Sequence, residues 1–490
     1  MNIADAISRH AVERPWAVAA IDGVQIVPYC ILDGAIDQAA ISLQQAGVKE
    51  GDTIGISMPG TALHLVVVYA LGRLGAIQID LPMMNSPAAR QAFVDRFNIA
   101  AVVGDGADLQ GVKTITPLPR WLDPAPPLRR KIVPRQPDAP FRINLSSGTT
   151  GPPKAVALTH GQYTLLFERE AAFFALKSTD RYLALVDLEF VSGLRRSLEI
   201  LNAGGTVVLA PRVTDPAAIC HLVDRYAITI MMLTVGTAAS LLSFVPGGGL
   251  RWPTVRLLRI GSSPIPADMR AAIAERLTPH LMISYGTNHI GNVALADAAL
   301  QAQHPDTVGR PTKDVEIEIV DAEHRPLPRG ELGSVRIRGP GFPTAYLDDA
   351  DTTARDFRDG WYYPGDLGVL TEQNDLLFKG RADDMINFDG VKIFPTEIEQ
   401  ELMRHPDVAE AAAFALPSQR FLQAPAAAVR LHRATDLARL LEYCRQRLGL
   451  RAPLTLFAVH ALPKNAMGKV LRRELAEIIR RQAEEEGALR

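Results

Sequence analysis

The sequence predicts an α/β protein with more than one domain, and three observations lead to that prediction. The chain has 490 residues, which exceeds what one hydrophobic core usually organises. Hydrophobic residues make up 47% and charged residues 22%, which is the balance of a folded globular protein. Short apolar runs bounded by Gly, Pro or Asp alternate with helical patterns, and this alternation is typical of layered folds with largely parallel sheets.

The individual elements follow in that alternating order. Apolar side chains at helical spacing predict a first helix over residues 3–14. A second helical pattern covers about residues 32–46 and stops at Gly47, a residue suited to the end of a helix. The short apolar runs predict buried strands at residues 53–58, 100–103, 181–186, 206–210 and 228–233.

A loop interrupts the alternation in the first half of the chain, and the pattern itself changes from about residue 315. Residues 117–140 are rich in Pro, Arg and Asp, and they indicate a connecting loop. Residues 315–320 and 333–338 alternate apolar with polar side chains, which predicts antiparallel strands. A domain boundary is expected near residues 379–383, followed by a small α+β domain. The tail, residues 474–490, is expected to be a charged, solvated helix.

Composition, charge and cysteine spacing argue against several kinds of partner, metal site and cellular location. The formal net charge of −2 gives no reason to expect a nucleic acid or an anionic membrane as partner. The three cysteines, Cys30, Cys220 and Cys444, lack metal-site spacing, and they are expected to be core residues in a reducing compartment. No signal peptide is indicated, and the longest early apolar run, residues 65–71, is too short to span a bilayer. We therefore expect a cytoplasmic protein without integral membrane contact.

A loop with the chemistry of a phosphate site lies at residues 146–154. It contains two glycines, four hydroxyl side chains and a terminal lysine. Glycine lets backbone N–H groups approach phosphate oxygens, and lysine supplies a point charge. The spacing differs from the Walker arrangement, and the alternative is a turn with an exposed lysine. The residues expected to bind ATP phosphates are Ser146, Ser147, Gly148, Thr149, Thr150, Gly151 and Lys154.

This loop resembles the signature [ST]-S-G-T-T-G-x-P-K of the adenylate-forming superfamily, which includes acyl-CoA synthetases, peptide-synthetase adenylation domains and luciferases. Further signatures of the superfamily follow in order and cover nearly the whole chain. The resemblance implies a large domain of αβαβα-type layers with a small β-barrel-like subdomain over residues 1–379. It also implies a hinge at 380–383 and a small, mobile α+β domain at 384–490.

The later signatures assign expected roles to single residues. The segment G-W-Y-Y-P-G-D ends at Asp366, and by resemblance this carboxylate accepts hydrogen bonds from the ribose hydroxyls. The segment G-R-A-D-D resembles the hinge motif, so Arg381 is expected to contact the ribose or phosphates, and Asp383 to be the pivot. Gly390 is expected beside a tunnel for a pantetheine arm. Lys469 ends a segment similar to P-K-T-x-x-G-K and is the expected catalytic lysine.

The acid and adenine pockets are marked by three weaker resemblances. Gly261, Ser262 and Ser263 begin a turn that resembles the one lining both pockets. Tyr285 and Gly286 resemble the start of Y-G-x-T-E, with the tyrosine ring expected to stack on adenine and Gly286 to border the acyl pocket. Phe190 aligns with a residue that gates the acyl pocket, although core packing explains a phenylalanine nearly as well. Asp187 and Glu189 lack the spacing expected of an amine-binding carboxylate, which argues against an amino acid substrate.

One segment departs from the superfamily pattern at the metal position. Asn288 and His289 stand where threonine and a Mg²⁺-binding glutamate are usual. Asn288 can still donate to phosphate, but Mg²⁺ prefers oxygen ligands to imidazole. Three interpretations remain open. ATP oxygens, water and a hydroxyl such as that of Thr150 hold the metal, or His289 coordinates a softer ion, or adenylation is impaired.

The sequence therefore predicts ATP- and Mg²⁺-dependent activation of a carboxylic acid to acyl-AMP, followed by transfer to a thiol. Coenzyme A is the favoured acceptor, and a phosphopantetheinylated carrier protein is the alternative. A degenerate protein that binds nucleotide or acyl groups without turnover is the second alternative, because of His289. Fatty, aryl and short branched acids all remain open as substrates.

Overall fold

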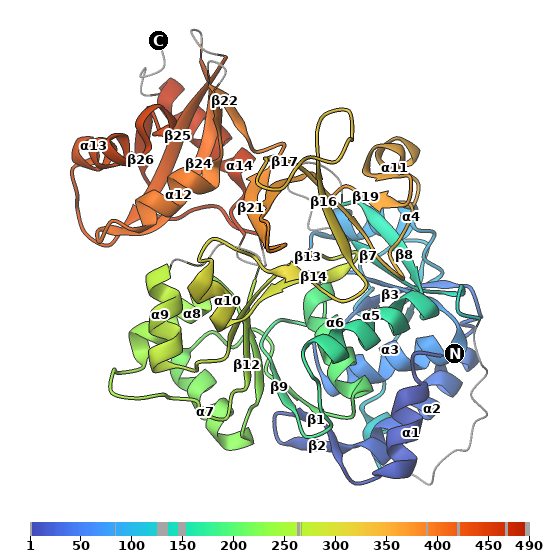
Figure 1. Ribbon diagram of the computed structural model, residues 1–490. Helices are drawn as coiled ribbons and strands as arrows, with labels where there is room; N and C mark the ends of the chain where they lie inside the picture. The colour runs from blue at the N-terminus through green and yellow to red at the C-terminus, as the bar shows by residue number, and fades with distance from the viewer. Residues whose placement is uncertain are drawn as a thin grey trace.

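The computed structural model describes residues 2–83, 85–124, 136–145, 153–261, 265, 267–388, 391–418, 422–465 and 469–485. Figure 1 shows a large body built from the first four-fifths of the chain and a smaller red and orange body beside it. Residues 146–152 of the predicted phosphate loop lie outside the described residues, as do Ser262, Ser263 and Gly390.

The largest sheet has nine strands, in the order β15-β14-β13-β12-β11-β9-β10-β1-β2. The contiguous strands from β13 to β1 run parallel, and antiparallel pairs close the two edges, which confirms the expectation of a largely parallel sheet. The strands are β1 Val18–Asp22, β2 Gln25–Pro28, β9 Arg181–Ala184, β10 Thr206–Leu209, β11 Ile230–Leu233, β12 Leu257–Ile260, β13 Leu281–Thr287, β14 Gly291–Ala296 and β15 Arg310–Pro311.

A second sheet has six strands, in the order β6-β5-β3-β4-β7-β8. Its strands are β3 Thr53–Ser57, β4 Ile77–Asp80, β5 Ala101–Gly104, β6 Lys113–Ile115, β7 Pro140–Leu145 and β8 Ala155–Thr159. The last two pair antiparallel, so the ends of β7 and β8 flank the predicted phosphate loop.

Helices fill the space between these sheets and cover their outer faces (Figure 1). Helix α3 contacts β4 in one sheet and β1 in the other, and it is buried on every side because it lies between them. Helices α7, α8 and α9 pack on the opposite face of the nine-stranded sheet. The helices of this body are α1 Asp5–Glu13, α2 Tyr29–Gln45, α3 Ala62–Leu74, α4 Pro87–Arg96, α5 His160–Phe173, α6 Val191–Asn202, α7 Pro216–Tyr226, α8 Val235–Phe244, α9 Ala267–Arg276, α10 Ala298–Gln303 and α11 Ala350–Asp356.

Local sequence explains several of these boundaries. The Thr159 side chain caps α5 and forms a reciprocal capping box with Gln162. Asp215 caps α7, and Pro216 occupies its first turn. Gly47 follows α2 with φ +98°, a left-handed conformation that glycine adopts without strain. The predicted loop 117–140 contains one short 3₁₀ turn, Pro119–Leu122, within its described part.

A six-stranded antiparallel sheet forms the predicted small β subdomain of the large body. The alternating segments at 315–320 and 333–338 become paired strands β16 and β17, as the sequence indicated. The strands are β16 Glu316–Val320, β17 Gly333–Arg338, β18 Phe357–Arg358, β19 Trp361–Tyr362, β20 Asp366–Leu370 and β21 Leu376–Arg381.

The C-terminal body has its own hydrophobic cores, formed by residues from Ile386 onward. One core holds Leu475 and Ile479, so the tail helix is not solvated all round, as its charge suggested, but buries one face. The elements are β22 Ile386–Phe388, β23 Val391–Ile393, α12 Pro395–Met403, β24 Val408–Ser418, β25 Leu422–Leu431, α13 Leu437–Leu448, η2 Gly449–Arg451, β26 Thr455–Ala458 and α14 Arg472–Glu485.

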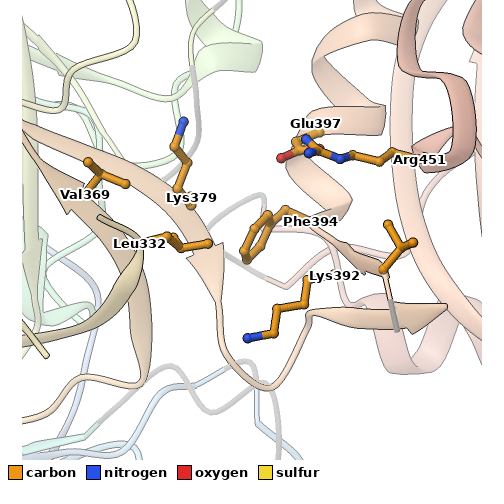
Figure 2. A pocket seen from close by; sticks show the side chains of 8 residues that line it. Leu332, Val369, Lys379, Lys392, Phe394, Glu397 and Arg451 are labelled. Atoms are coloured by element: carbon orange, nitrogen blue, oxygen red, sulfur yellow. The ribbon is translucent and has the colours of Figure 1, made fainter. Parts of the chain in front are cut away.

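A pocket of about 450 Å³ lies between the two bodies, lined on one side by Lys379 of β21 and on the other by Lys392 of β23. Figure 2 shows Leu332 pointing toward Phe394 across this pocket. The hydroxyl of Thr396 donates to the carbonyl of Lys379 at 2.9 Å, so direct contacts also join the bodies.

Two of the three cysteines are buried core residues, as expected, and Cys30 is half-buried. Across the described parts of the chain, no helix is both long and apolar enough to cross a membrane.

Candidate active site

A buried carboxylate stands at the start of β20, where the sequence placed the ribose-binding group. Asp366 is 6% exposed and pairs in register with Arg381 at the end of β21. The Tyr285 hydroxyl donates to one carboxylate oxygen of Asp366 at 2.5 Å, and Arg381 donates to the other at 3.2 Å. Burial raises the pKa of Asp366, and the positive charge of Arg381 opposes that shift. The carboxylate is thus oriented by two donors before any nucleotide arrives.

Arg381 is held by three acceptors on this edge of the small sheet. Besides Asp366, its guanidinium donates to the carbonyl of Pro364 at 2.5 Å and to Asp383 at 3.1 Å. Gly365 has φ +80°, and a Cβ there would lie 3.0 Å from the Arg381 guanidinium. The glycine of the G-D motif therefore allows the arginine to lie close to the backbone.

Lys469 of the C-terminal body reaches the same place. Its backbone N–H donates to the Asn465 side chain at 3.0 Å, which fixes the turn that carries it. Burial lowers the pKa of Lys469, and repulsion from Arg381 adds to this, while Asp366 opposes it. The structure therefore brings Lys469 within electrostatic range of Asp366 and Arg381, which are paired on adjacent strands of the large body.

The lysine that closes the predicted phosphate loop has partners that the sequence did not reveal. Lys154 Nζ lies 2.6 Å from a carboxylate oxygen of Asp356 and 5.1 Å from the centre of the Tyr346 ring. The Tyr346 hydroxyl donates to the same carboxylate at 3.0 Å. These contacts position the ammonium beside the end of the loop.

The segment that begins at Tyr285 forms the turn between β13 and β14. A Cβ on Gly286 would lie 2.0 Å from the carbonyl oxygen of Gly291, so only glycine fits there. The amide of Asn288 donates at 3.3 Å to the carbonyl of Leu145, the last residue before the phosphate loop. Asn288 thus lies at the base of that loop, where a phosphate donor was expected.

His289 lies among charged neighbours but carries no charge at neutral pH. It is 4% exposed, and its Nδ1 has no hydrogen-bond partner among the described residues. Burial, followed by repulsion from Lys154 and Arg195, lowers the pKa of His289 to about 4. In the described parts of the chain, no three His, Cys, Asp or Glu side chains form a group that could hold a metal ion.

The acidic residues near Phe190 have structural partners. Asp187 and Glu189 are both buried, and Arg212 donates to them at 2.8 Å and 2.9 Å. Glu189 also accepts from the backbone of Met83 at 2.8 Å. Both carboxylates are thereby paired within the protein. Phe190 is half-buried and directly precedes α6.

A family model described as AMP-binding enzyme matches residues 7–347, and a second, described as AMP-binding enzyme C-terminal domain, matches residues 397–469. The chain belongs to the AMP-binding enzyme family. The first match spans both large sheets, and the second covers most of the C-terminal body and ends at Lys469. Strands β20 and β21, which carry Asp366 and Arg381, lie between the two matches.

Relatives within the AMP-binding enzyme family align over nearly the whole chain. A 2-succinylbenzoate–CoA ligase of Geobacillus kaustophilus is 29% identical over 96% of this chain and 97% of its own length. A salicyl-AMP ligase/salicyl-S-ArCP synthetase of Mycobacterium tuberculosis is 28% identical over 91% of this chain and 84% of its own length.

The fold agrees with a solved member of the family. The o-succinylbenzoate CoA synthetase of Bacillus subtilis, in complex with its acyl-adenylate intermediate, has a TM-score of 0.88 and 25% identity, covering 96% of this chain and 97% of that chain. Its complex with ATP and a magnesium ion superposes with a TM-score of 0.87 at 25% identity, covering 96% and 99% of the two chains.

Proposed function

We propose that this AMP-binding enzyme activates a carboxylic acid with ATP and transfers the acyl group to a thiol. The observation that carries the proposal is the meeting of Asp366, Arg381 and Lys469 from two separate bodies of the chain. A buried carboxylate with a guanidinium beside it suits a ribose, and a nearby desolvated lysine suits an anionic reacting centre.

In the first half-reaction, an oxygen of the acid attacks the α-phosphorus of Mg·ATP. The new bond joins the acid oxygen to phosphorus, the bond to the β-phosphate oxygen breaks, and pyrophosphate leaves. Lys154 and the loop 146–151 bind the phosphates, with Asn288 as a further donor at the base of that loop. Lys469 offsets the negative charge that accumulates between the carboxylate and the α-phosphate.

In the second half-reaction, a thiol attacks the acyl carbon and the bond to AMP breaks, so that a thioester and AMP form. Lys469 has no role in this step. We propose that residues 384–490 rotate about the hinge 380–383, which withdraws Lys469 and brings the Gly390 turn to the site. The contact between Arg381 and Asp383, at 3.1 Å, lies on that hinge and changes in the rotation.

Coenzyme A is our first choice of thiol, since a 2-succinylbenzoate–CoA ligase is among the relatives that align from end to end. The salicyl-S-ArCP synthetase supports a carrier protein as the alternative. The two are separated by measuring AMP release from purified acyl-AMP with free CoA and with phosphopantetheinylated carrier proteins.

The absence of a metal-binding glutamate favours one other function, a protein that binds nucleotide without turnover. His289 is neutral and buried where that carboxylate is usual in the superfamily. The test is pyrophosphate release from Mg·ATP over a broad panel of carboxylic acids. We expect pyrophosphate release that depends on the acid added. ATP binding with no pyrophosphate release for any acid would instead support a protein that binds nucleotide without turnover.

A further inference from the structure

A positively charged side chain lies inside the nine-stranded sheet, in a strand that is otherwise apolar. Arg259 is half-buried in β12, between the buried residues Leu258 and Ile260. It pairs in register with Met232 of β11 and Met282 of β13, and all three are half-buried where the neighbouring positions are buried. These three side chains thus lie side by side across the sheet and are less covered than their neighbours along each strand.

Arg259 lies directly behind the nucleotide-binding residues. Its Nε donates to the Ser284 hydroxyl at 2.5 Å, and Ser284 precedes Tyr285, which holds Asp366. A Cβ on Gly261 would lie 3.1 Å from a terminal guanidinium nitrogen of Arg259. One end of the guanidinium thus lies beside Gly261, the first residue of the segment that is expected to line the acid pocket.

The charge of Arg259 is not neutralised by a neighbouring carboxylate. Among the described residues, no Asp or Glu oxygen lies within 4.0 Å of its guanidinium. The two acidic side chains whose charges act on Arg259 pair with another arginine, because Arg196 contacts Glu170 at 3.1 Å and Glu199 at 2.6 Å. Burial and repulsion from Arg196 lower the pKa of Arg259 to about 10, so it is still a cation at neutral pH.

We propose that Arg259, supported by Ser284, binds a second carboxylate on the acid substrate, so that this ligase prefers dicarboxylic acids to monocarboxylic ones. This inference rests on the proposed function of the site. A guanidinium fork matches a carboxylate in two hydrogen bonds, and a desolvated cation gains most from an anionic partner. A substrate without that group leaves the cation without an anionic partner, and sites of this kind reject such analogues strongly.

The competing explanation is structural, in which Arg259 only balances the interior charges of Glu170 and Glu199. Those glutamates already contact Arg196, and Glu170 also accepts two hydrogen bonds from the Asn292 side chain at 2.8 Å. The geometry therefore does not require Arg259 for charge balance. The preference of the protein for dicarboxylic over monocarboxylic acids distinguishes the two explanations.

The experiment compares matched acids in the pyrophosphate-release assay with the full-length protein. The pairs are hexanoate with adipate, and phenylacetate with its para-carboxy and para-hydroxy derivatives. We expect a higher kcat/KM for the carboxy member of at least one pair. Arg259→Met should lower that value by about 10- to 100-fold and leave the monocarboxylate unchanged or improved. Arg259→Lys keeps the charge and should retain part of the preference.

Arg256→Met is the matched control, because Arg256 immediately precedes the same strand but pairs with Asp180 at its opposite end. It should leave the selectivity unchanged. Equal losses for both members of a pair in Arg259→Met, or a preference for the monocarboxylate or the hydroxy acid in the unmodified protein, would overturn the proposal.

A binding measurement distinguishes failure of this proposal from failure of the catalytic one. If no acid releases pyrophosphate, the proposed function fails, and the melting temperature with AMP plus adipate or para-carboxyphenylacetate tests Arg259 alone. The dicarboxylate should then raise the melting temperature of the unmodified protein more than the matched monocarboxylate does. Arg259→Met should abolish this difference, and no difference in the unmodified protein would contradict the proposal.

Discussion

At the scale of single residues, the site depends on polar groups that are oriented before substrate binds. Asp366 accepts from Tyr285 and Arg381, and Lys154 pairs with Asp356. In a desolvated site such preorganised contacts are worth more than the same contacts in water, because little reorganisation is needed. Substitution of any of these side chains should therefore change nucleotide binding or activity by a measurable amount.

We predict that Asp366→Asn raises the KM for ATP by roughly 10- to 100-fold, because an amide cannot accept from two ribose hydroxyls as a carboxylate does. Tyr285→Phe should have a smaller effect, since Asp366 keeps its contact with Arg381. Steady-state kinetics at varied ATP provide the measurement, with Asp351→Asn in α11 as an exposed control. An unchanged KM in Asp366→Asn would remove Asp366 from the nucleotide site.

His289 gives a prediction about pH. Its pKa falls from 6.5 to about 4 on folding, mainly through burial, so the unfolded chain binds a proton in this range and the folded chain does not. The stability that comes from the neutral histidine is therefore complete above pH 6.5 and is lost as the pH falls toward 4. We expect His289→Asn to flatten that acid-side fall by about 1–3 kcal/mol.

The measurement for His289 is the free energy of unfolding in urea at several pH values between 4 and 7. His64 is also buried, and burial lowers its pKa to about 3, so the variant keeps part of the pH dependence. If the free energy of unfolding changes with pH in the same way in the unmodified protein and in His289→Asn, His289 is not buried in its neutral form.

At the scale of elements, turns at the ends of strands position the chemistry. The end of β13 carries Tyr285 and Gly286, and Asn288 begins the turn to β14. The β20–β21 pair places Asp366 opposite Arg381. These turns need close backbone approach, which explains the glycines within the motifs.

We predict that Gly286→Ala destabilises the protein by about 1–3 kcal/mol and lowers activity, because its Cβ would meet the backbone of Gly291. Gly236 in α8 is the matched control, since the nearest atom to a Cβ there is 3.8 Å away. Gly236→Ala should be neutral or stabilising by up to about 1 kcal/mol. Thermal unfolding of both variants is the measurement, and equal melting temperatures would contradict the close contact at Gly286.

The sequence predicted the elements and much of the site because both are encoded in contiguous patterns. Periodicity indicated the parallel strands, and short motifs indicated Asp366, Arg381 and Lys469. It missed Asp356, because its contact with Lys154 joins positions 202 residues apart and exists only after folding. It also missed Arg259, which in sequence is one charge in a short apolar run, and the buried face of α14, whose apolar residues are few among many charges.

At the scale of the whole molecule, the proposed mechanism makes the relative placement of the two bodies decide which half-reaction is possible. In this structure the charge of Lys469 is felt by Asp366, and that of Arg381 by Lys469, which is the proximity that the proposed adenylation step needs. The pocket between Lys379 and Lys392 and the hydrogen bond from Thr396 to the Lys379 carbonyl both lie where the two bodies adjoin. Both must change if the small body rotates. We therefore predict that residues 380–383 are the hinge of this rotation as well as the boundary between the two bodies.

The most direct test of the account is to measure the two half-reactions separately in Lys469→Ala. We predict that this variant loses pyrophosphate release from acid and Mg·ATP by at least about 100-fold, because one cation is missing from the transition state. Thioester formation from purified acyl-AMP should remain within about threefold of the unmodified protein. Lys464→Ala is the matched control, since Lys464 lies in the same turn but pairs with Glu410. Equal losses in both half-reactions of Lys469→Ala would contradict the central claim that this lysine serves adenylation alone.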